Sequence, residues 1–195
     1  LRVSSLAEAL RLGESAFRQH FARHARYEDH AFTALNTAFV QDGAYVEIAR
    51  EQLVEAPIHI VYVACGEDRP EVSYPRALIV AGENSQATVI ESYVGLGGAY
   101  FSNAVTEVAA AEGANIDHYR VQRESESAYH VGLLHLYQGR SSRIRSLSVN
   151  FGGGLVRNDV VTILDGEGAD GTLNGFSMTR GTQHVDNHLR VEHAQ

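Results

Sequence analysis

The sequence predicts a mainly β fold: a parallel β-helix, or solenoid, with about two strands per turn, preceded by a short N-terminal helical segment. Three observations support this prediction. Two short strand patterns recur four times between Gly82 and the end of the chain, at a nearly constant period. No helix-length apolar pattern separates the two strands of a unit. The chain has 18 glycines and only 3 prolines, which suits many tight corners.

The first strand of each unit sets the period. One apolar series keeps its register with steps of 27, 28 and 27 (121−94, 149−121, 176−149): Val94, Val121, Val149 and Phe176. A second apolar series comprises Val89, Ile116 and Ile144, and a polar series comprises Thr88, Asn115, Arg143 and Asp170. Because neighbouring turns stack about 4.8 Å apart, we expect like residues to form ladders.

The second strand agrees, with steps of 28, 27 and 29 (133−105, 160−133, 189−160) for Val105, Leu133, Val160 and Leu189. In the middle turns, residues of both parities are apolar: Leu133, Leu134 and Leu136, then Val160, Val161 and Ile163. A solenoid strand needs only its inward face apolar. We therefore expect the outer face of this strand to be covered by another layer or by a partner.

The N-terminal segment has helix signals from residue 4 to about residue 30. Ser5 and Glu8 form a capping box, and Gly13 divides the segment into two short helices. The apolar stripe of these helices comprises Leu6, Leu10, Phe17 and Phe21. We assign residues 1–33 to this helical segment, the remnant of a helical domain, and residues 34–195 to a β-helix core that is incomplete at its C-terminal end.

The segment that precedes the repeat is predicted to contain strands at 44–49, 58–64 and 77–81, with residues 66–75 as a loop insertion. We expect Gly113, Gly139 and Gly166 to turn the corner before each first strand. The stretches 95–98 and 152–154 are also expected to be corners, because they lack the Lys-Ser/Thr of a phosphate loop. The chain starts without Met and stops at Gln195 in a strand-like run, so we expect a fragment that self-associates through an exposed strand edge.

Composition narrows the function classes. The net charge is −8, from 24 acidic and 16 basic residues, and no run of basic residues occurs, which argues against a nucleic-acid partner. No stretch is long and apolar enough to span a membrane, and no signal peptide opens the chain. The single cysteine, Cys65, rules out an internal disulfide framework and favours a reducing, cytoplasmic location.

Several side chains could be taken for a chemical site. His184 and His188 share a strand face but lie roughly 13 Å apart, too far for one metal ion, and His193 has the opposite parity. Glu107 and His135 are separated by one step of the repeat (135−107 = 28), so the two can stack. For this pair we favour a self-satisfying polar ladder over a catalytic pair.

The remaining candidates are also expected to be structural. Cys65 fits a semi-buried thiol, because one cysteine cannot hold an iron–sulfur cluster alone. A β-helix polysaccharide lyase or hydrolase is the enzymatic alternative, with acidic candidates Asp159, Asp165, Glu167 and Asp170. These four fall near corners, where acidic residues form turns, and the chain has no Trp as a sugar platform. We therefore predict no catalytic, cofactor-binding or metal residue.

A family resemblance runs through most of the chain. The segments that carry it are FTALNTAFVQDGAYVEI (32–48), EAPIHIVYVA (55–64), PRALIVAGENSQATVIESYVG (75–95) and HVDNHLRVEHAQ (184–195). They resemble the SufD family of iron–sulfur cluster assembly proteins, whose core is a β-helix. The stretch Leu35-Asn36-Thr37-Ala38 is similar to the D-type subunit rather than to its paralogue SufB.

The resemblance implies a non-catalytic scaffold subunit of a SufBCD-type complex. Such a subunit pairs with SufB through the β-helices and with the SufC ATPase through C-terminal helices, which would follow Gln195. The ATPase activity belongs to SufC, and the full complex assembles the iron–sulfur cluster transiently. The resemblance therefore implies that this segment holds no cofactor itself, and no functional residue is carried over to it.

Overall fold

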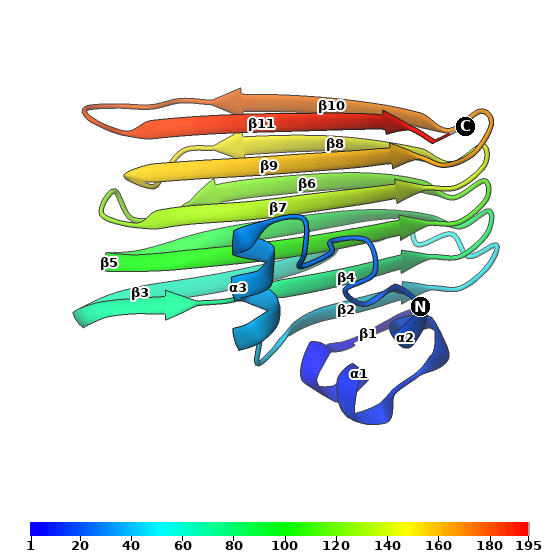
Figure 1. Ribbon diagram of the computed structural model, residues 1–195, viewed down its shortest axis with the longest axis horizontal. Helices are drawn as coiled ribbons and strands as arrows, with labels where there is room; N and C mark the ends of the chain where they lie inside the picture. Colours follow the sequence, from blue (N-terminus) through cyan, green and yellow to red (C-terminus); the bar gives the residue numbers. More distant parts are fainter. Residues whose placement is uncertain (195) are drawn as a thin grey trace.

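The computed structural model is a parallel β-solenoid of about five turns with short helices near the N-terminus, so the predicted fold class is confirmed (Figure 1). It describes residues 1–194, apart from the side chains at positions 67 and 68. Gln195, the last residue of the expected core, lies outside the described residues. Each turn contributes one strand to a front sheet and one to a back sheet.

The front sheet starts with the only antiparallel pair among the described strands, β1 (Arg2–Ser5) with β2 (Gly43–Ile48). It continues in parallel through β4 (Arg76–Ala81), the second half of β5 (Gln86–Ala110), β7 (Tyr129–Gln138), β9 (Leu155–Leu164) and β11 (His184–His193). The back sheet comprises β3 (Ile58–Ser73), the first half of β5, β6 (Asn115–Arg123), β8 (Arg143–Asn150) and β10 (Asp170–Ser177).

Strand β3 corrects one expectation. Residues 66–75 are not a loop insertion, because β3 runs through Ser73 and pairs with β5 on both sides of the corner. Gly66 lies opposite Gly98, and a Cβ on Gly98 would stand 1.6 Å from the Gly66 carbonyl oxygen. Long-range pairing thus overrides the local turn signal of Gly66 and Pro70.

Most of the predicted first-strand register is confirmed. The confirmed neighbours are Ile116–Ile144, Val121–Val149, Val149–Phe176, Asn115–Arg143 and Arg143–Asp170. The prediction is off by two positions at Thr88, Val89 and Val94, because Gln86 lies opposite Asn115, a step of 29 (115−86). An offset of two leaves each side chain on its predicted face.

The second-strand register is right at both ends and wrong in the middle. Val105 lies opposite Leu133, and Val160 opposite Leu189, as expected. Leu133, however, lies opposite Asp159, so Leu134 is the true neighbour of Val160. A slip of one residue exchanges the two faces of a strand. Leu134 and Val160 therefore point into the solenoid, whereas Leu133 points outward.

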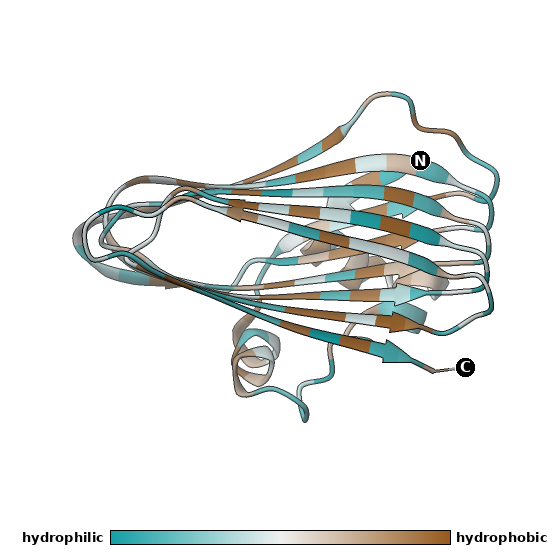
Figure 2. Ribbon diagram, turned by 90° about the horizontal axis from the view of Figure 1, so that it is seen from above, coloured by the Kyte–Doolittle hydropathy of each residue, from teal (hydrophilic) through white to brown (hydrophobic). Residues whose placement is uncertain are grey.

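The interior is divided along the strands. Figure 2 shows the two sheets lying close together at one end and diverging toward the other. The wide half holds the main apolar core, whose largest fully buried members include Ile48, Ile79, Ile116, Leu134, Leu136 and Ile144. The narrow half holds buried polar and charged side chains. The same strands therefore carry two kinds of core.

Three short helices precede β2: α1 (Leu6–Leu12), α2 (Ser15–His20) and α3 (Ala31–Phe39). Ser5 Oγ accepts the Glu8 N–H at 3.1 Å, and Gly13 ends α1 with φ +61°, as the capping and breaking signals predict. Of the predicted stripe, Leu6 and Phe17 are buried, whereas Leu10 is about half exposed. The domain boundary at 33/34 stays a prediction. None of the described helices is long and apolar enough to cross a membrane.

The expected cover over the outer apolar face is part of this chain. Residues 21–30 cross the front sheet between α2 and α3, as Figure 1 shows for the two helices and their connection. Ala25 packs there against Val105 and Leu133, with Val161 at the edge of the cluster. The prediction of another layer is thus confirmed for the front sheet.

The corners between turns share one backbone conformation. One residue of each turn has a positive φ at the same position: Glu51, Asn84, Gly113, Ser141 and Gly168. Only Gly113 of the three predicted corner glycines occupies this position. Gly139 and Gly166 lie two residues before it and have ordinary φ values. Stacking of neighbouring corners, rather than glycine alone, holds the left-handed residue in place.

Candidate functional site

The polar half of the interior contains a group of buried titratable residues. The side chains that point into this half belong to three neighbouring strands of the back sheet and to the front-sheet strands that face them. The fully or almost fully buried members are Glu91, His118, Arg120, Gln122, Glu124 and His130. Charged side chains are rarely buried unless they are paired. These six are paired with one another.

Glu91 is the centre of the first group. Its carboxylate lies 2.8 Å from His118 Nε2, and it accepts the hydroxyls of Thr106 at 2.9 Å and Tyr93 at 3.2 Å. His118 Nδ1 lies 3.1 Å from Ser146 Oγ on the next turn. Burial alone would raise the pKa of Glu91, but the bond and charge of His118 and the Arg120 charge hold that pKa below its usual value.

Glu124 organises the second group. His130 Nδ1 lies 2.7 Å from Glu124 Oε2, and Arg120 donates to His130 Nε2. A guanidinium only donates, so His130 Nε2 is the acceptor of this bond. Ser102 and Gln122 complete the shell of the carboxylate at 2.9 and 2.8 Å. The pKa of Glu124, which burial would raise, is held low by His130 and these donors.

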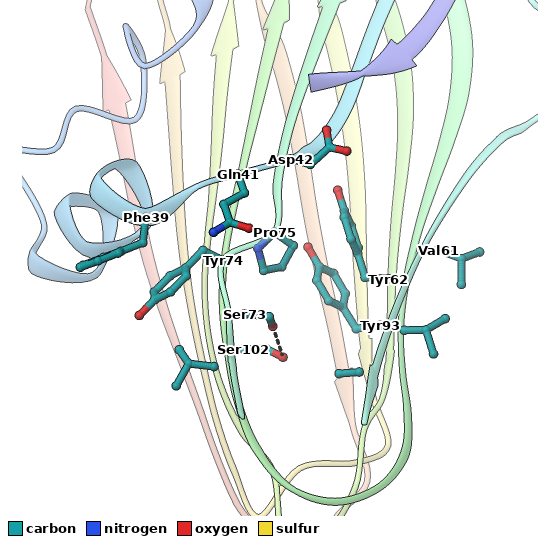
Figure 3. Close-up of a pocket in the computed structure, with 13 residues that line it drawn as sticks. Phe39, Gln41, Asp42, Val61, Tyr62, Ser73, Tyr74, Pro75, Tyr93 and Ser102 are labelled. Atoms are coloured by element: carbon teal, nitrogen blue, oxygen red, sulfur yellow. Dashed lines mark hydrogen bonds between the residues drawn. The ribbon is translucent and has the colours of Figure 1, made fainter. Parts of the chain in front are cut away.

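The network borders a cavity at the first turn (Figure 3). This cavity has a volume of about 500 Å³. Its walls include Phe39, Gln41, Asp42, Tyr62, Ser73, Tyr74, Pro75, Tyr93 and Ser102. Tyr93 and Ser102 belong to both the cavity wall and the network, so the cavity adjoins the polar half of the interior.

A second polar cluster lies outside the solenoid, under the N-terminal segment. Glu107 and His135 are in register, as predicted. The Glu107 carboxylate, however, forms its hydrogen bonds with groups other than the His135 imidazole. This buried carboxylate accepts Arg76 Nη2 at 2.6 Å and the backbone N–H groups of Ala22 and Ala25, both at 3.0 Å. Glu107 therefore anchors the covering segment to the front sheet.

His135 is left beside that anchor. Its Nδ1 has no hydrogen-bond partner among the described residues. Burial is the main reason that its pKa falls to about 4, and the nearby His24 lowers it further. His24 stacks on Tyr137, with ring centres 4.7 Å apart, and lies 2.9 Å from His20. Burial likewise lowers the pKa of His20 and of His24, so this histidine group is neutral at pH 7.

The acidic residues weighed for a carbohydrate enzyme have separate partners. Asp159 accepts Arg157 Nη2 at 2.7 Å, and His30 and His188 lie 3.1 and 3.4 Å from its oxygens. Asp165 accepts the Tyr137 hydroxyl, and Asp170 accepts Arg143 Nε at 3.0 Å. Glu167 lies in the corner after β9, where its carbonyl accepts Ser141 N.

The remaining sequence candidates lie on two strands. His184 and His193 stand at the two ends of β11, while His188 is near its middle, next to Asp159. Cys65 lies in β3 and is half-buried, as predicted. The interior network was missed by the sequence analysis, although β6 shows its signal. There His118, Arg120 and Gln122 occupy the parity of the core residue Ile116.

The Leu-Asn-Thr-Ala stretch fixes α3 to the front sheet. Asn36 is fully buried and donates to the carbonyls of Asn103 at 2.7 Å and Pro75 at 3.1 Å. Arg76 Nη1 in turn donates to Asn36 Oδ1 at 3.2 Å and to Thr37 Oγ1 at 2.9 Å. The buried Arg76–Glu107 pair thus ties both helix α3 and the covering segment to one point of the solenoid.

Comparison with protein families supplies the context. The family model described as "SUF system FeS cluster assembly, SufBD core domain" matches residues 62–195. The model described as "SufBD protein N-terminal region" matches residues 1–60. The chain belongs to the SufBD family. The boundary between the two matched regions falls within β3, so the SufBD core comprises nearly all of the complete solenoid turns.

Named relatives agree with this assignment. An iron–sulfur cluster assembly SufBD family protein of Synechocystis is 30% identical over 169 residues, covering 82% of this chain and 37% of the relative. SufD of Escherichia coli is 26% identical, covering 83% and 39%. SufB of Bacillus subtilis is 24% identical, covering 95% and 40%. The chain thus spans about two fifths of the length of these relatives.

Proposed function

We propose that this SufBD protein is a D-type, non-catalytic scaffold subunit of a SufBCD-type iron–sulfur cluster assembly complex. One observation carries the proposal: the two SufBD models together match almost the whole chain, which folds as a rigid two-sheet solenoid. The Leu-Asn-Thr-Ala stretch and the SufD proteins among the relatives support the D-type assignment.

The internal chemistry supports a platform rather than a catalyst. The buried carboxylates Glu91, Glu107 and Glu124 all accept hydrogen bonds from fixed neighbours. Groups that stabilise one another in this way stiffen the fold and are not exposed to a substrate. We assign the ATPase activity to a SufC-like partner and treat the iron–sulfur cluster as the cargo of the full complex, assembled in the cytoplasm.

The proposed partners are a SufB-like subunit, which pairs through the solenoid, and a SufC-like ATPase. We further propose that this chain, studied alone, self-associates through the outer edge of β10 and β11. Phe176, Leu189 and Val191 on these strands are each about half exposed, and an unpaired strand edge readily accepts another strand.

The decisive experiment is affinity purification of the full-length protein, co-expressed with SufB and SufC relatives under reducing, oxygen-free conditions. A stable complex containing both partners is the expected result. Failure to retain either partner would overturn the scaffold assignment. A thermal-shift screen with Ca²⁺ and acidic oligosaccharides tests the polysaccharide lyase or hydrolase alternative, and a large rise in Tm with either would favour that enzyme.

A further inference from the structure

The cavity of Figure 3 lies where the front sheet extends further than the back sheet. The front sheet extends past β4 to β2 and β1, whereas the back sheet ends at β3, whose only partner among the described strands is β5. Inward-facing residues of the first turn therefore lack a layer beneath them. Tyr62 is such a residue, and it forms one wall of the cavity together with Tyr93, its neighbour on the next turn.

Aromatic rings line both sides of this cavity. Tyr62 and Tyr93 are stacked, with ring centres 4.8 Å apart, and Phe39 and Tyr74 are stacked at 5.4 Å. Figure 3 shows the two pairs on opposite sides of Pro75. The faces of aromatic rings carry negative electrostatic potential and attract cations. The Tyr93 ring already has the guanidinium carbon of Arg120 5.2 Å from its centre.

The described side chains that line the cavity carry charge of one sign only. Asp42 is the single charged side chain among its 13 lining residues. Behind the wall, the Tyr93 hydroxyl donates to Glu91 at 3.2 Å. A positively charged group in the cavity would therefore meet a carboxylate at the rim and electron-rich rings at the sides, and none of the lining side chains would repel it.

Tyr62 adds a vacant hydrogen-bonding position. Its hydroxyl oxygen is buried and has no hydrogen-bond partner among the described residues. Burial and the nearby Glu91 raise the pKa of Tyr62 well above its usual value, so the group remains a neutral phenol. A buried hydroxyl without a partner is costly, and an N–H donor entering the cavity would remove that cost.

We propose that this cavity binds an organic cation, a protonated amine or a guanidinium, between the two aromatic pairs. The Asp42 carboxylate and the Tyr62 hydroxyl accept its N–H groups. The volume falls in the range of small-ligand sites and accommodates a group of the size of an arginine side chain. Such a cation comes either from a free small molecule or from a basic residue of a protein, and this site does not depend on the proposed scaffold role.

Isothermal titration calorimetry of the full-length protein tests the proposal with two matched ligand pairs. The first pair is arginine amide and citrulline amide, which differ by the replacement of a guanidinium with a neutral urea. The second pair is a short extended peptide carrying arginine or citrulline at its centre. We expect the arginine member of at least one pair to bind at least tenfold more tightly than its citrulline match, and its affinity to fall with added salt.

Three variants locate the site. Asp42→Asn keeps an oxygen for the Ala7 N–H that Asp42 Oδ1 now accepts, and should weaken binding about tenfold. Tyr62→Phe should weaken it several-fold. Glu55→Gln, an exposed carboxylate outside the cavity, should leave binding unchanged. Circular dichroism and Tm confirm that each variant is folded.

The outcomes separate support from refutation. Binding of the arginine peptide but not of arginine amide identifies a protein source, and equal binding of both identifies a small molecule. Equal affinity for arginine and citrulline ligands, no heat with either at millimolar concentration, or an Asp42→Asn variant that binds normally would overturn the proposal.

Discussion

The wide and narrow halves of the solenoid interior share the same strands and the same register, yet they are stabilised differently. In the wide half, apolar side chains such as Leu136 and Ile116 gain stability from the area they bury. In the narrow half, Glu91 and Glu124 are held by specific donors at fixed distances. Removing one apolar group leaves a cavity, whereas removing one network member leaves several partners unsatisfied.

The largest expected effect comes from the centre of the polar half. Glu91→Met removes the acceptor of His118, Thr106 and Tyr93, and should lower the free energy of unfolding by about 4 kcal/mol. Chemical denaturation followed by circular dichroism measures this value. Glu91→Gln, which keeps one acceptor oxygen, should lose clearly less. A loss below about 1 kcal/mol for Glu91→Met would show that the network is not cooperative.

The matched test in the apolar half is Leu136→Ala. Leu136 is fully buried, so this change should cost about 3 kcal/mol through lost burial and a residual cavity. The same denaturation experiment applies, repeated at pH 5 and pH 7. The cost should be the same at both pH values, because the apolar cluster around Leu136 consists of aliphatic side chains that do not titrate. A cost that changes with pH would remove the distinction between the halves.

His135 extends the comparison to the polar cluster outside the solenoid. Its folded pKa of about 4 is below its unfolded value of about 6.5, so the unfolded state takes up a proton first. Stability should therefore fall as the pH drops from 6.5 toward 4, by up to about 3 kcal/mol in total. His135→Asn should flatten the curve of unfolding free energy against pH in this window. An unchanged slope would contradict the assignment.

The smallest effect should come from an exposed ion pair on the outer face of the back sheet. Arg145 Nε lies 2.6 Å from Asp117 Oδ1, but its side chain is about half exposed. Arg145→Ala should cost less than about 1 kcal/mol, because water screens the pair. Arg76→Ala, which breaks the fully buried pair with Glu107, is the contrasting control and should cost several times more. Equal losses in thermal melts would refute this contrast.

The sequence predicted the parts of the fold that repetition encodes. The ladders of β6, β8 and β10 follow from apolar residues at equal steps, and the covered outer face follows from Leu133 and Leu134 both being apolar. The strand course of residues 66–73 could not be predicted, because Gly66 and Pro70 signal a turn locally. Pairing with β5, one full turn further along the chain, overrides that signal.

The interior network escaped prediction for a related reason. The sequence analysis assumed that side chains pointing into the solenoid are apolar. His118, Arg120 and Gln122, which all point inward from β6, do not follow this rule. Their partners Glu91, Glu124 and His130 lie outside that strand, and only the three-dimensional register brings them within bonding distance. For Glu107, the expected neighbour in register, His135, was correct. The hydrogen-bond donors to the Glu107 carboxylate, however, come from the N-terminal segment and β4.

The left-handed residue at each corner between turns affects how solenoids of this kind can gain or lose turns during evolution. Because Asn84, Gly113, Ser141 and Gly168 occupy the same corner of successive coils, each coil ends in the orientation in which the next begins. A complete coil is therefore an interchangeable module. Duplication or deletion of a whole module during evolution would keep the apolar and the polar halves of the interior in register. An insertion of any other length would put them out of register.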